Sequence, residues 1–174
     1  SLRHDGIYTP PSLQGSVQYP GMIGGMNWGS VAIDPLRRLV IANTQRIATK
    51  IRLVPQEELA ARYPDGPPAY GYEPQSGSPY FLERLPMLSP LGAPCNAPPW
   101  GTLAAIDTTT GEKKWEVTLG TSRDLAPWPI WLRTGTPNLG GPLTTASGLV
   151  FIGATTDFYV RAFETETGEE LWRK

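Results

Sequence analysis

One short segment occurs twice in the sequence, and this repeat limits the possible folds more than any other feature. Residues 105–115 (AIDTTTGEKKW) and residues 162–172 (AFETETGEELW) share the pattern Ala-x-Asp/Glu-x-x-Thr-Gly-x-x-x-Trp. Each copy starts in an apolar run typical of a β-strand, turns at its Gly, and ends in a second short strand that carries the Trp. Gly111 and Gly168 suit the left-handed backbone that closes such a turn. The repeat therefore predicts two equivalent β-hairpins in two similar structural units.

Two further apolar segments precede each hairpin, so each unit is predicted to be a four-stranded sheet. They are residues 31–34 and 39–42 before the first hairpin, and residues 143–145 and 149–152 before the second. Gly and Pro, at 19 residues each, interrupt the chain too often for long helices. We therefore expect an all-β fold. The flat Trp at the end of each hairpin suits packing between adjacent sheets.

Residues 44–100 separate the two strand pairs of the first unit and form an insertion. More than half of the 19 prolines fall in it, so we expect it to contribute no central strands. Residues 56–62 have the composition of one or two helical turns, which Pro64 would end. Aromatic side chains are too frequent in the rest for a disordered linker, which favours an ordered covering loop.

Charge and cysteine content argue against several classes of protein. The net charge is −1 and 18% of the residues are charged, so nucleic acid and anionic membrane surfaces are not expected partners. Cys95 is the only cysteine, which rules out an internal disulfide and a cysteine-built metal cage. No apolar run approaches the roughly 18 residues that span a bilayer, so a membrane anchor is expected outside this chain.

The repeated pattern resembles the tryptophan-docking blades of the quinoprotein dehydrogenases, in which each Trp locks one blade to the next. The first copy matches every position, and the second has Glu164 where Asp is usual. The resemblance implies a fragment of about two four-stranded blades of an eight-bladed β-propeller.

The blade boundaries follow from the repeat and the resemblance together. Residues 1–28 would be the end of a preceding blade and a cofactor-side loop, and residues 29–117 a blade that contains the insertion 44–100. Residues 118–140 would be an inter-blade loop, and residues 141–174 the next blade.

Three more stretches are similar to the membrane-bound branch of glucose and quinate dehydrogenases that use pyrroloquinoline quinone (PQQ). They are residues 8–15 with 25–29, residues 91–101, and residues 135–142. The resemblance implies PQQ with Ca²⁺ or Mg²⁺ as cofactors, a sugar or polyol such as glucose or quinate as substrate, and ubiquinone as electron acceptor. It also implies the periplasmic face of the bacterial inner membrane.

The same resemblance places the catalytic Asp base and the metal ligands upstream of this chain. We therefore assign no catalytic residue and no metal ligand within it, and we expect the fragment alone to be inactive. A metal acting as Lewis acid beside a carboxylate base is the chemistry implied for the whole protein.

By resemblance, four residues of this chain lie beside the cofactor. Asn27 matches a family Asn whose amide bonds the quinone, and an amide can both donate and accept. Its neighbour Trp28 belongs to the same set, although packing is favoured over binding for this side chain. Leu139 offers apolar contact to the ring, and Gly140 lets backbone come close. A local turn for Asn27 and a plain loop for Leu139 are the alternatives.

Several other polar residues are interpreted from their local sequence. Asp157 and Glu169 could approach a metal, but both fall in predicted turns, where a solvated role is favoured. His4 is expected in a fraying terminus. Arg123 and Asp124 are expected to form a weak surface pair.

Two rival functions and one folding question stay open at this stage. Outer-membrane assembly lipoproteins have similar propellers with the same type of Trp blade and use them as non-enzymatic scaffolds. Fold alone does not decide function. A soluble PQQ alcohol dehydrogenase is the second alternative. Two blades taken from a closed ring would expose sheet faces, so we expect marginal stability or self-association of the isolated chain.

Overall fold

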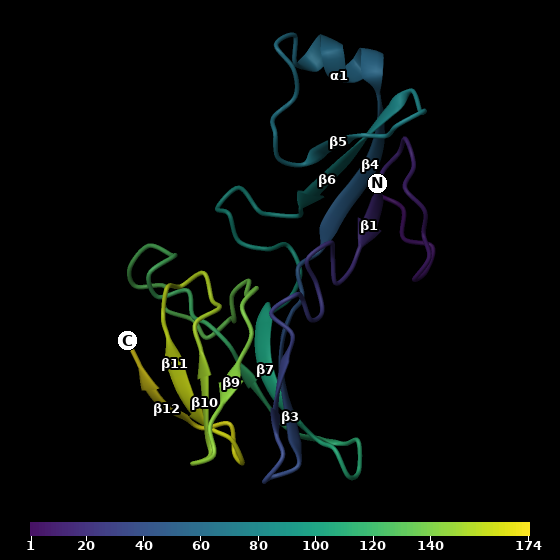
Figure 1. Cartoon of the computed structure of the whole chain (residues 1–174). Coiled ribbons are helices and arrows are strands. Elements are labelled where there is room, and N and C mark those ends of the chain that lie inside the picture. The colour runs from purple at the N-terminus through teal and green to yellow at the C-terminus, as the bar shows by residue number, and fades with distance from the viewer. The chain divides into compact units, whose positions relative to one another are not determined.

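The computed structural model describes residues 1–174 and contains three four-stranded antiparallel sheets (Figure 1). The predicted all-β class is confirmed. The strands are β1 Ser16–Gln18, β2 Val31–Asp34, β3 Leu39–Gln45, β4 Thr49–Pro55, β5 Tyr72–Pro74, β6 Tyr80–Pro86, β7 Gly101–Asp107, β8 Lys113–Thr118, β9 Leu143–Thr144, β10 Leu149–Ile152, β11 Arg161–Glu164 and β12 Glu170–Arg173. The one helix, α1 Gln56–Arg62, has 7 residues and is too short to cross a bilayer.

The chain forms two compact units. The first contains Ser1–Met22 and Ile47–Asn96, and the second contains Ile23–Arg46 and Ala97–Lys174. Both copies of the sequence repeat lie in the second unit.

The second unit consists of two sheets, in the orders β2-β3-β7-β8 and β12-β11-β10-β9. Each repeated segment forms the hairpin of its last two strands, β7 with β8 and β11 with β12. Apolar side chains from both sheets make one shared core. The core residues are Leu39, Ile41, Leu103, Ala105, Leu119, Val150, Ile152 and Phe163. The alternating apolar positions read from the sequence are thus the inward faces of two packed sheets.

Trp115 lies between these two sheets, as the repeat predicts. Its indole nitrogen donates a hydrogen bond of 3.0 Å to the carbonyl oxygen of Thr165. A Cβ added to Gly168 would lie 2.6 Å from the Trp115 ring, so the turn and the ring are in direct contact. Trp172, at the same position of the second hairpin, is 48% exposed, because β12 is the edge strand of its sheet.

The first unit corrects the prediction for the insertion. Its sheet has the order β1-β4-β6-β5, so the insertion strands β4 and β6 are central strands. The prolines do not prevent this, because Pro55, Pro74 and Pro86 are each the last residue of their strand. A proline at that position removes no hydrogen bond from the middle of the ladder.

The helical turn predicted at residues 56–62 is confirmed as α1, whose Leu59 is buried. Beside it, the Glu83 carboxylate is buried and pairs with Lys50 at 2.9 Å. Burial alone raises the pKa of Glu83, but Lys50, Tyr72 and Arg62 outweigh it and hold that pKa below its usual range. Tyr72 donates to Glu83, and its contacts with Tyr63, its burial and this carboxylate raise the pKa of Tyr72 to about 12.

The N-terminus is better ordered than expected. Arg3 bridges Ser16 in parallel, and its backbone exchanges hydrogen bonds with Gly15 and Val17, each at 2.9 Å. His4 itself is exposed. The terminal segment is therefore held against β1 rather than frayed, because its backbone groups find partners there.

Candidate cofactor-side site

Two loops that are far apart in the sequence meet through their glycines in the second unit. A Cβ on Gly29 would lie 2.4 Å from the backbone nitrogen of Gly141, and a Cβ on Gly141 would lie 1.8 Å from the carbonyl oxygen of Gly29. Only glycine permits backbones this close. The approach brings Asn27 and Trp28 beside Leu139 and Gly140, the four residues predicted for the cofactor side.

Asn27 forms a turn and keeps part of its amide for other partners. Its Oδ1 accepts a hydrogen bond of 2.8 Å from the backbone N–H of Trp28, and its carbonyl accepts one of 3.0 Å from Ser30. Its Nδ2 donates only a long bond of 3.4 Å, to the carbonyl of Ile23. The local turn therefore orients the amide, and its second N–H donor is available for a ligand.

Trp28 and Leu139 present open apolar surface. Trp28 is 87% exposed and Leu139 is 41% exposed. The packing role considered for Trp28 is therefore not found within this chain. The backbone of Leu139 is held in place by a hydrogen bond of 3.3 Å from its N–H to the carbonyl of Ala154. Together these side chains can contact a flat ring, while Gly140 beside them is exposed and adds no side chain.

Behind these loops lie three buried amide side chains that sequence reasoning missed. Asn43 is 6% exposed, Gln45 is 0% exposed and Asn138 is 2% exposed. The available signal was the presence of Asn43 and Gln45 at the end of the otherwise apolar strand β3. Amides that are buried in this way need hydrogen-bond partners.

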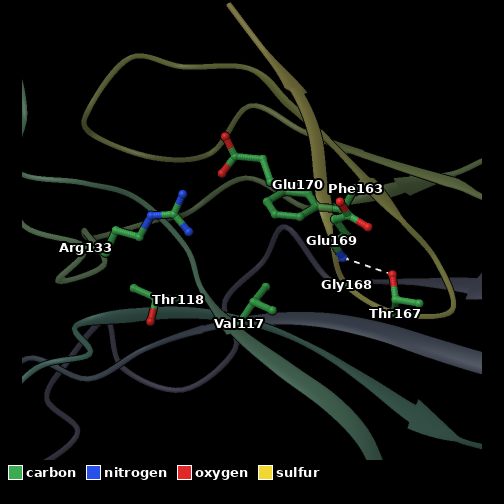
Figure 2. A pocket seen from close by; sticks show the side chains of 8 residues that line it. All are labelled: Val117, Thr118, Arg133, Phe163, Thr167, Gly168, Glu169 and Glu170. Carbon is green, nitrogen blue, oxygen red and sulfur yellow. Dashed lines mark hydrogen bonds between the residues drawn. The ribbon is translucent and has the colours of Figure 1, made fainter.

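A separate cavity of about 570 Å³ lies between β8 and the β11–β12 hairpin (Figure 2). Its lining residues are Val117, Thr118, Arg133, Phe163, Thr167, Gly168, Glu169 and Glu170. Figure 2 shows Arg133 and Glu170 above Val117 and Thr118. Glu169 lies in the exposed turn that the sequence predicted. None of the four residues predicted for the cofactor side lines this cavity.

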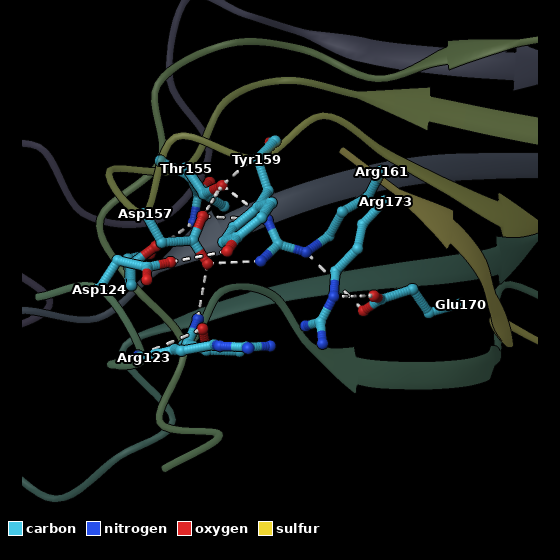
Figure 3. Close-up of polar contacts among 12 residues, drawn as sticks. Arg123, Asp124, Thr155, Asp157, Tyr159, Arg161, Glu170 and Arg173 are labelled. Carbon is cyan, nitrogen blue, oxygen red and sulfur yellow. Dashed lines mark hydrogen bonds and ion pairs between the residues drawn. The ribbon is translucent and has the colours of Figure 1, made fainter. Parts of the chain in front are cut away.

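Asp157 corrects a second expectation, because it is buried rather than solvated (Figure 3). Its carboxylate forms an ion pair with the buried Arg161 and accepts hydrogen bonds from the Thr155 hydroxyl and from the Thr121 N–H at 2.8 Å. Burial raises the pKa of Asp157, but Arg161, Thr155 and Thr121 outweigh it and hold that pKa below its usual range. Both carboxylate oxygens are used, so Asp157 links the segment after β10 to the loop after β8.

The expected surface pair of Arg123 and Asp124 is also wrong. Asp124 accepts a hydrogen bond of 2.7 Å from the Tyr159 hydroxyl, and Arg123 lies over the Trp131 ring at 4.8 Å. Arg123 thus contacts an aromatic ring of its own loop, and Asp124 bonds a residue of a more distant segment.

Comparison with known proteins identifies the family. The sequence profile of the family described as "PQQ: Glucose/ethanol/alcohol dehydrogenase, beta-propeller domain" matches residues 1–174. The chain belongs to this family. This PQQ-dehydrogenase propeller chain is therefore part of a β-propeller domain, and the resemblance read from the Trp repeat is confirmed.

Curated relatives of this propeller chain come from several bacteria. A probable quinate dehydrogenase (quinone) of Xanthomonas campestris pv. juglandis is 42% identical over 99% of this chain and 23% of its own length. The quinate/shikimate dehydrogenase (quinone) of Acinetobacter baylyi is 41% identical over 99% of this chain and 22% of its own length. The quinoprotein glucose dehydrogenase of Escherichia coli is 38% identical over 99% and 23%. The chain thus spans less than a quarter of these relatives.

Solved structures of quinohemoprotein alcohol dehydrogenases share the fold. The enzyme ADHIIG from Pseudomonas putida HK5 has a TM-score of 0.56 and 25% identity, over 91% of this chain and 20% of that chain. The enzyme from Comamonas testosteroni has a TM-score of 0.52 and 22% identity, over 92% and 20%.

No group of three or more His, Cys, Asp or Glu side chains in this propeller chain is arranged to hold a metal ion. The backbone contact at Gly29 and Gly141 brings the loop of Asn27 and Trp28 next to the loop of Leu139 and Gly140. Such a set of residues can orient and cover an organic ring.

Proposed function

We propose that this chain is part of a PQQ-dependent dehydrogenase that oxidises a sugar or polyol and passes the electrons to ubiquinone. The observation that carries the proposal is the direct contact between the loop of Asn27 and the loop of Leu139 and Gly140. It joins the two stretches that resemble the cofactor side of the family in one place on the fold.

The chemistry of the four residues fits one edge and one face of a flat quinone. Asn27 has an amide N–H to donate to a ring carbonyl. Trp28 and Leu139 have exposed apolar surface that would be buried against the ring. None of the four is charged, so the acidic groups of PQQ would need cationic partners from other parts of the protein.

When bound, PQQ supplies the electron-accepting group for oxidation of the substrate hydroxyl. The residues of this chain would position it: Asn27 by hydrogen bonding, and Leu139 by excluding water from the ring face. We propose that the whole protein supplies the Asp base and the ligands of a Ca²⁺ or Mg²⁺ ion from outside this chain.

The names of the relatives support the proposed substrate class and a quinone as acceptor. Two of them are named as quinate dehydrogenases that use a quinone, and a third as a glucose dehydrogenase. We therefore propose quinate, glucose or a similar polyol as substrate. Resemblance to the membrane-bound branch supports a location at the periplasmic face of the bacterial inner membrane.

We also propose the blade boundaries stated from the sequence. Residues 29–117 form one blade and residues 141–174 the next, with residues 44–100 inserted in the first. Residues 1–28 and 118–140 then provide the cofactor-side and inter-blade loops.

The test is an assay of the full-length protein loaded with PQQ and either Ca²⁺ or Mg²⁺, in which a redox dye reports electron transfer. We expect reduction with quinate, glucose or another polyol. Activity with simple alcohols alone would favour the soluble alcohol dehydrogenase alternative. Failure with every substrate, despite correct folding, would favour a propeller scaffold.

A further inference from the structure

We propose that Asn43, Gln45 and Asn138 are positioning residues that hold both cofactor-side loops in the arrangement that binds PQQ. This inference rests on the proposed function for the identity of the ligand. The three buried amides are connected by hydrogen bonds into one network at the end of β3.

Asn138 is the centre of the network and precedes Leu139 directly. Its Nδ2 donates to the carbonyls of Thr44 and Thr136, both at 3.1 Å, so both of its N–H groups are used. Its Oδ1 accepts a bond of 2.6 Å from Asn43. An amide is the only side chain of this size that can donate twice and accept at the same place.

Asn43 connects the network to the second loop a second time. Its Nδ2 also donates to the carbonyl of Gly140 at 2.8 Å. The carbonyl of Gly140 and the N–H of Leu139 both have hydrogen-bond partners, so the backbone that carries the exposed Leu139 side chain is held on both sides.

Gln45 connects the network to the first loop. Its Nε2 donates to the carbonyl of Ile23 at 2.6 Å, and its Oε1 accepts from the backbone N–H of Asn138 at 3.3 Å. Its backbone forms a two-way bridge with Gly25, at 2.9 and 3.1 Å. One side chain therefore ties the turn that carries Asn27 to the loop that carries Leu139.

These hydrogen bonds imply that the protein interior fixes the position of one loop relative to the other. The contact between Gly29 and Gly141 allows the two loops little relative movement, because their backbones touch. A small displacement of either loop would separate the Asn27 amide from the Leu139 face, and misplaced contacts cost affinity steeply.

Two alanine variants of the full-length protein test the connection of each loop separately. Asn43→Ala removes the bond to Gly140, so backbone hydrogen exchange should rise at residues 139–141 and stay unchanged at residues 23–25. Gln45→Ala removes the bond to Ile23, so exchange should rise first at residues 23–25. The control is Val150→Ala, which opens the shared core without touching the network.

Asn138→Asp tests the centre of the network. The new carboxylate cannot donate to the carbonyls of Thr44 and Thr136 and would repel them. We expect PQQ affinity, measured by titration of intrinsic fluorescence, to fall by roughly tenfold or more. Val150→Ala, at an equal loss of melting temperature, should leave PQQ affinity within about twofold.

The inference is overturned if the amide variants change exchange and PQQ affinity only in proportion to their loss of stability, as Val150→Ala does. Failure of the proposed function looks different. In that case the unmodified protein binds no PQQ, while the loop-specific exchange pattern of the ligand-free variants is still seen.

Discussion

The indole N–H of Trp115 donates a 3.0 Å hydrogen bond to the carbonyl oxygen of Thr165, from one four-stranded sheet to the next. Thr165 lies in the second copy of the same repeat that supplies Trp115 in the first. The repeat therefore encodes both halves of the contact, the ring at the end of one hairpin and the turn that receives it in the following one.

Replacing Trp115 by Phe should destabilise the 174-residue chain. The change removes the hydrogen bond to Thr165 and part of the ring, at a cost of about 1 to 2 kcal/mol. Trp172→Phe is the matched control, because Trp172 is 48% exposed, and it should cost less than about 0.5 kcal/mol. Urea denaturation measures both, and equal losses would contradict the docking role of Trp115.

Gly168 and Gly111 form a second matched pair. Both have φ of 74°, but a Cβ on Gly168 meets the Trp115 ring at 2.6 Å, whereas a Cβ on Gly111 meets nothing within 4 Å. In the 174-residue chain, Gly111→Ala should cost about 1 kcal/mol from backbone strain alone. Gly168→Ala should cost at least about 1 kcal/mol more because the ring must move. A similar melting temperature for the two variants would refute the contact.

Breaking the buried pair of Asp157 and Arg161 should be strongly destabilising. Asp157→Ala leaves the Arg161 guanidinium buried without its main partner and frees the Thr121 N–H, at a cost of about 3 to 5 kcal/mol. The double variant Asp157→Leu with Arg161→Met should recover much of this loss, since no charge stays buried. Chemical denaturation of the full-length protein tests this, and additive losses would speak against a coupled pair.

Glu83 should make the stability of the first unit depend on acid pH. Its pKa is held below the ordinary value of 4.5, so the ionised form stabilises the fold above that value. Stability is then lost as the pH falls through the lowered pKa. Glu83→Gln should lower the unfolding free energy at neutral pH and reduce its change between about pH 5 and pH 3. An unchanged pH profile would show that the pairing with Lys50 contributes nothing.

The isolated chain should associate with copies of itself. β8 and β12 are edge strands, and the half-exposed Trp172 lies on β12. Unpaired strands and exposed aromatic surface favour self-association. Sedimentation velocity over a range of concentrations measures it, and a cooperative, well-folded monomer at every concentration would contradict this expectation.

The errors of sequence reasoning have a common cause. The proline content of the insertion predicts no central strands, yet Pro55 and Pro86 fall at the ends of β4 and β6. Asp157 was expected in water because its neighbours in sequence suggest a turn, yet its partners include Thr121 of a distant loop. Composition cannot show where a residue falls relative to a strand end or a distant partner.

What the sequence alone determined was local and repeated: the hairpins, their turn glycines, the family and the stretches expected beside the cofactor. The hairpins and their glycines follow from periodicity and turn chemistry over a few neighbouring residues, and the family and the expected cofactor-side stretches follow from the resemblance of short motifs. Only the tertiary structure showed that Gly29 and Gly141 touch and that Asn43, Gln45 and Asn138 join behind them. Close backbone approach and buried amide pairing depend on residues that are distant in the chain, so they exist only once the sheets have packed.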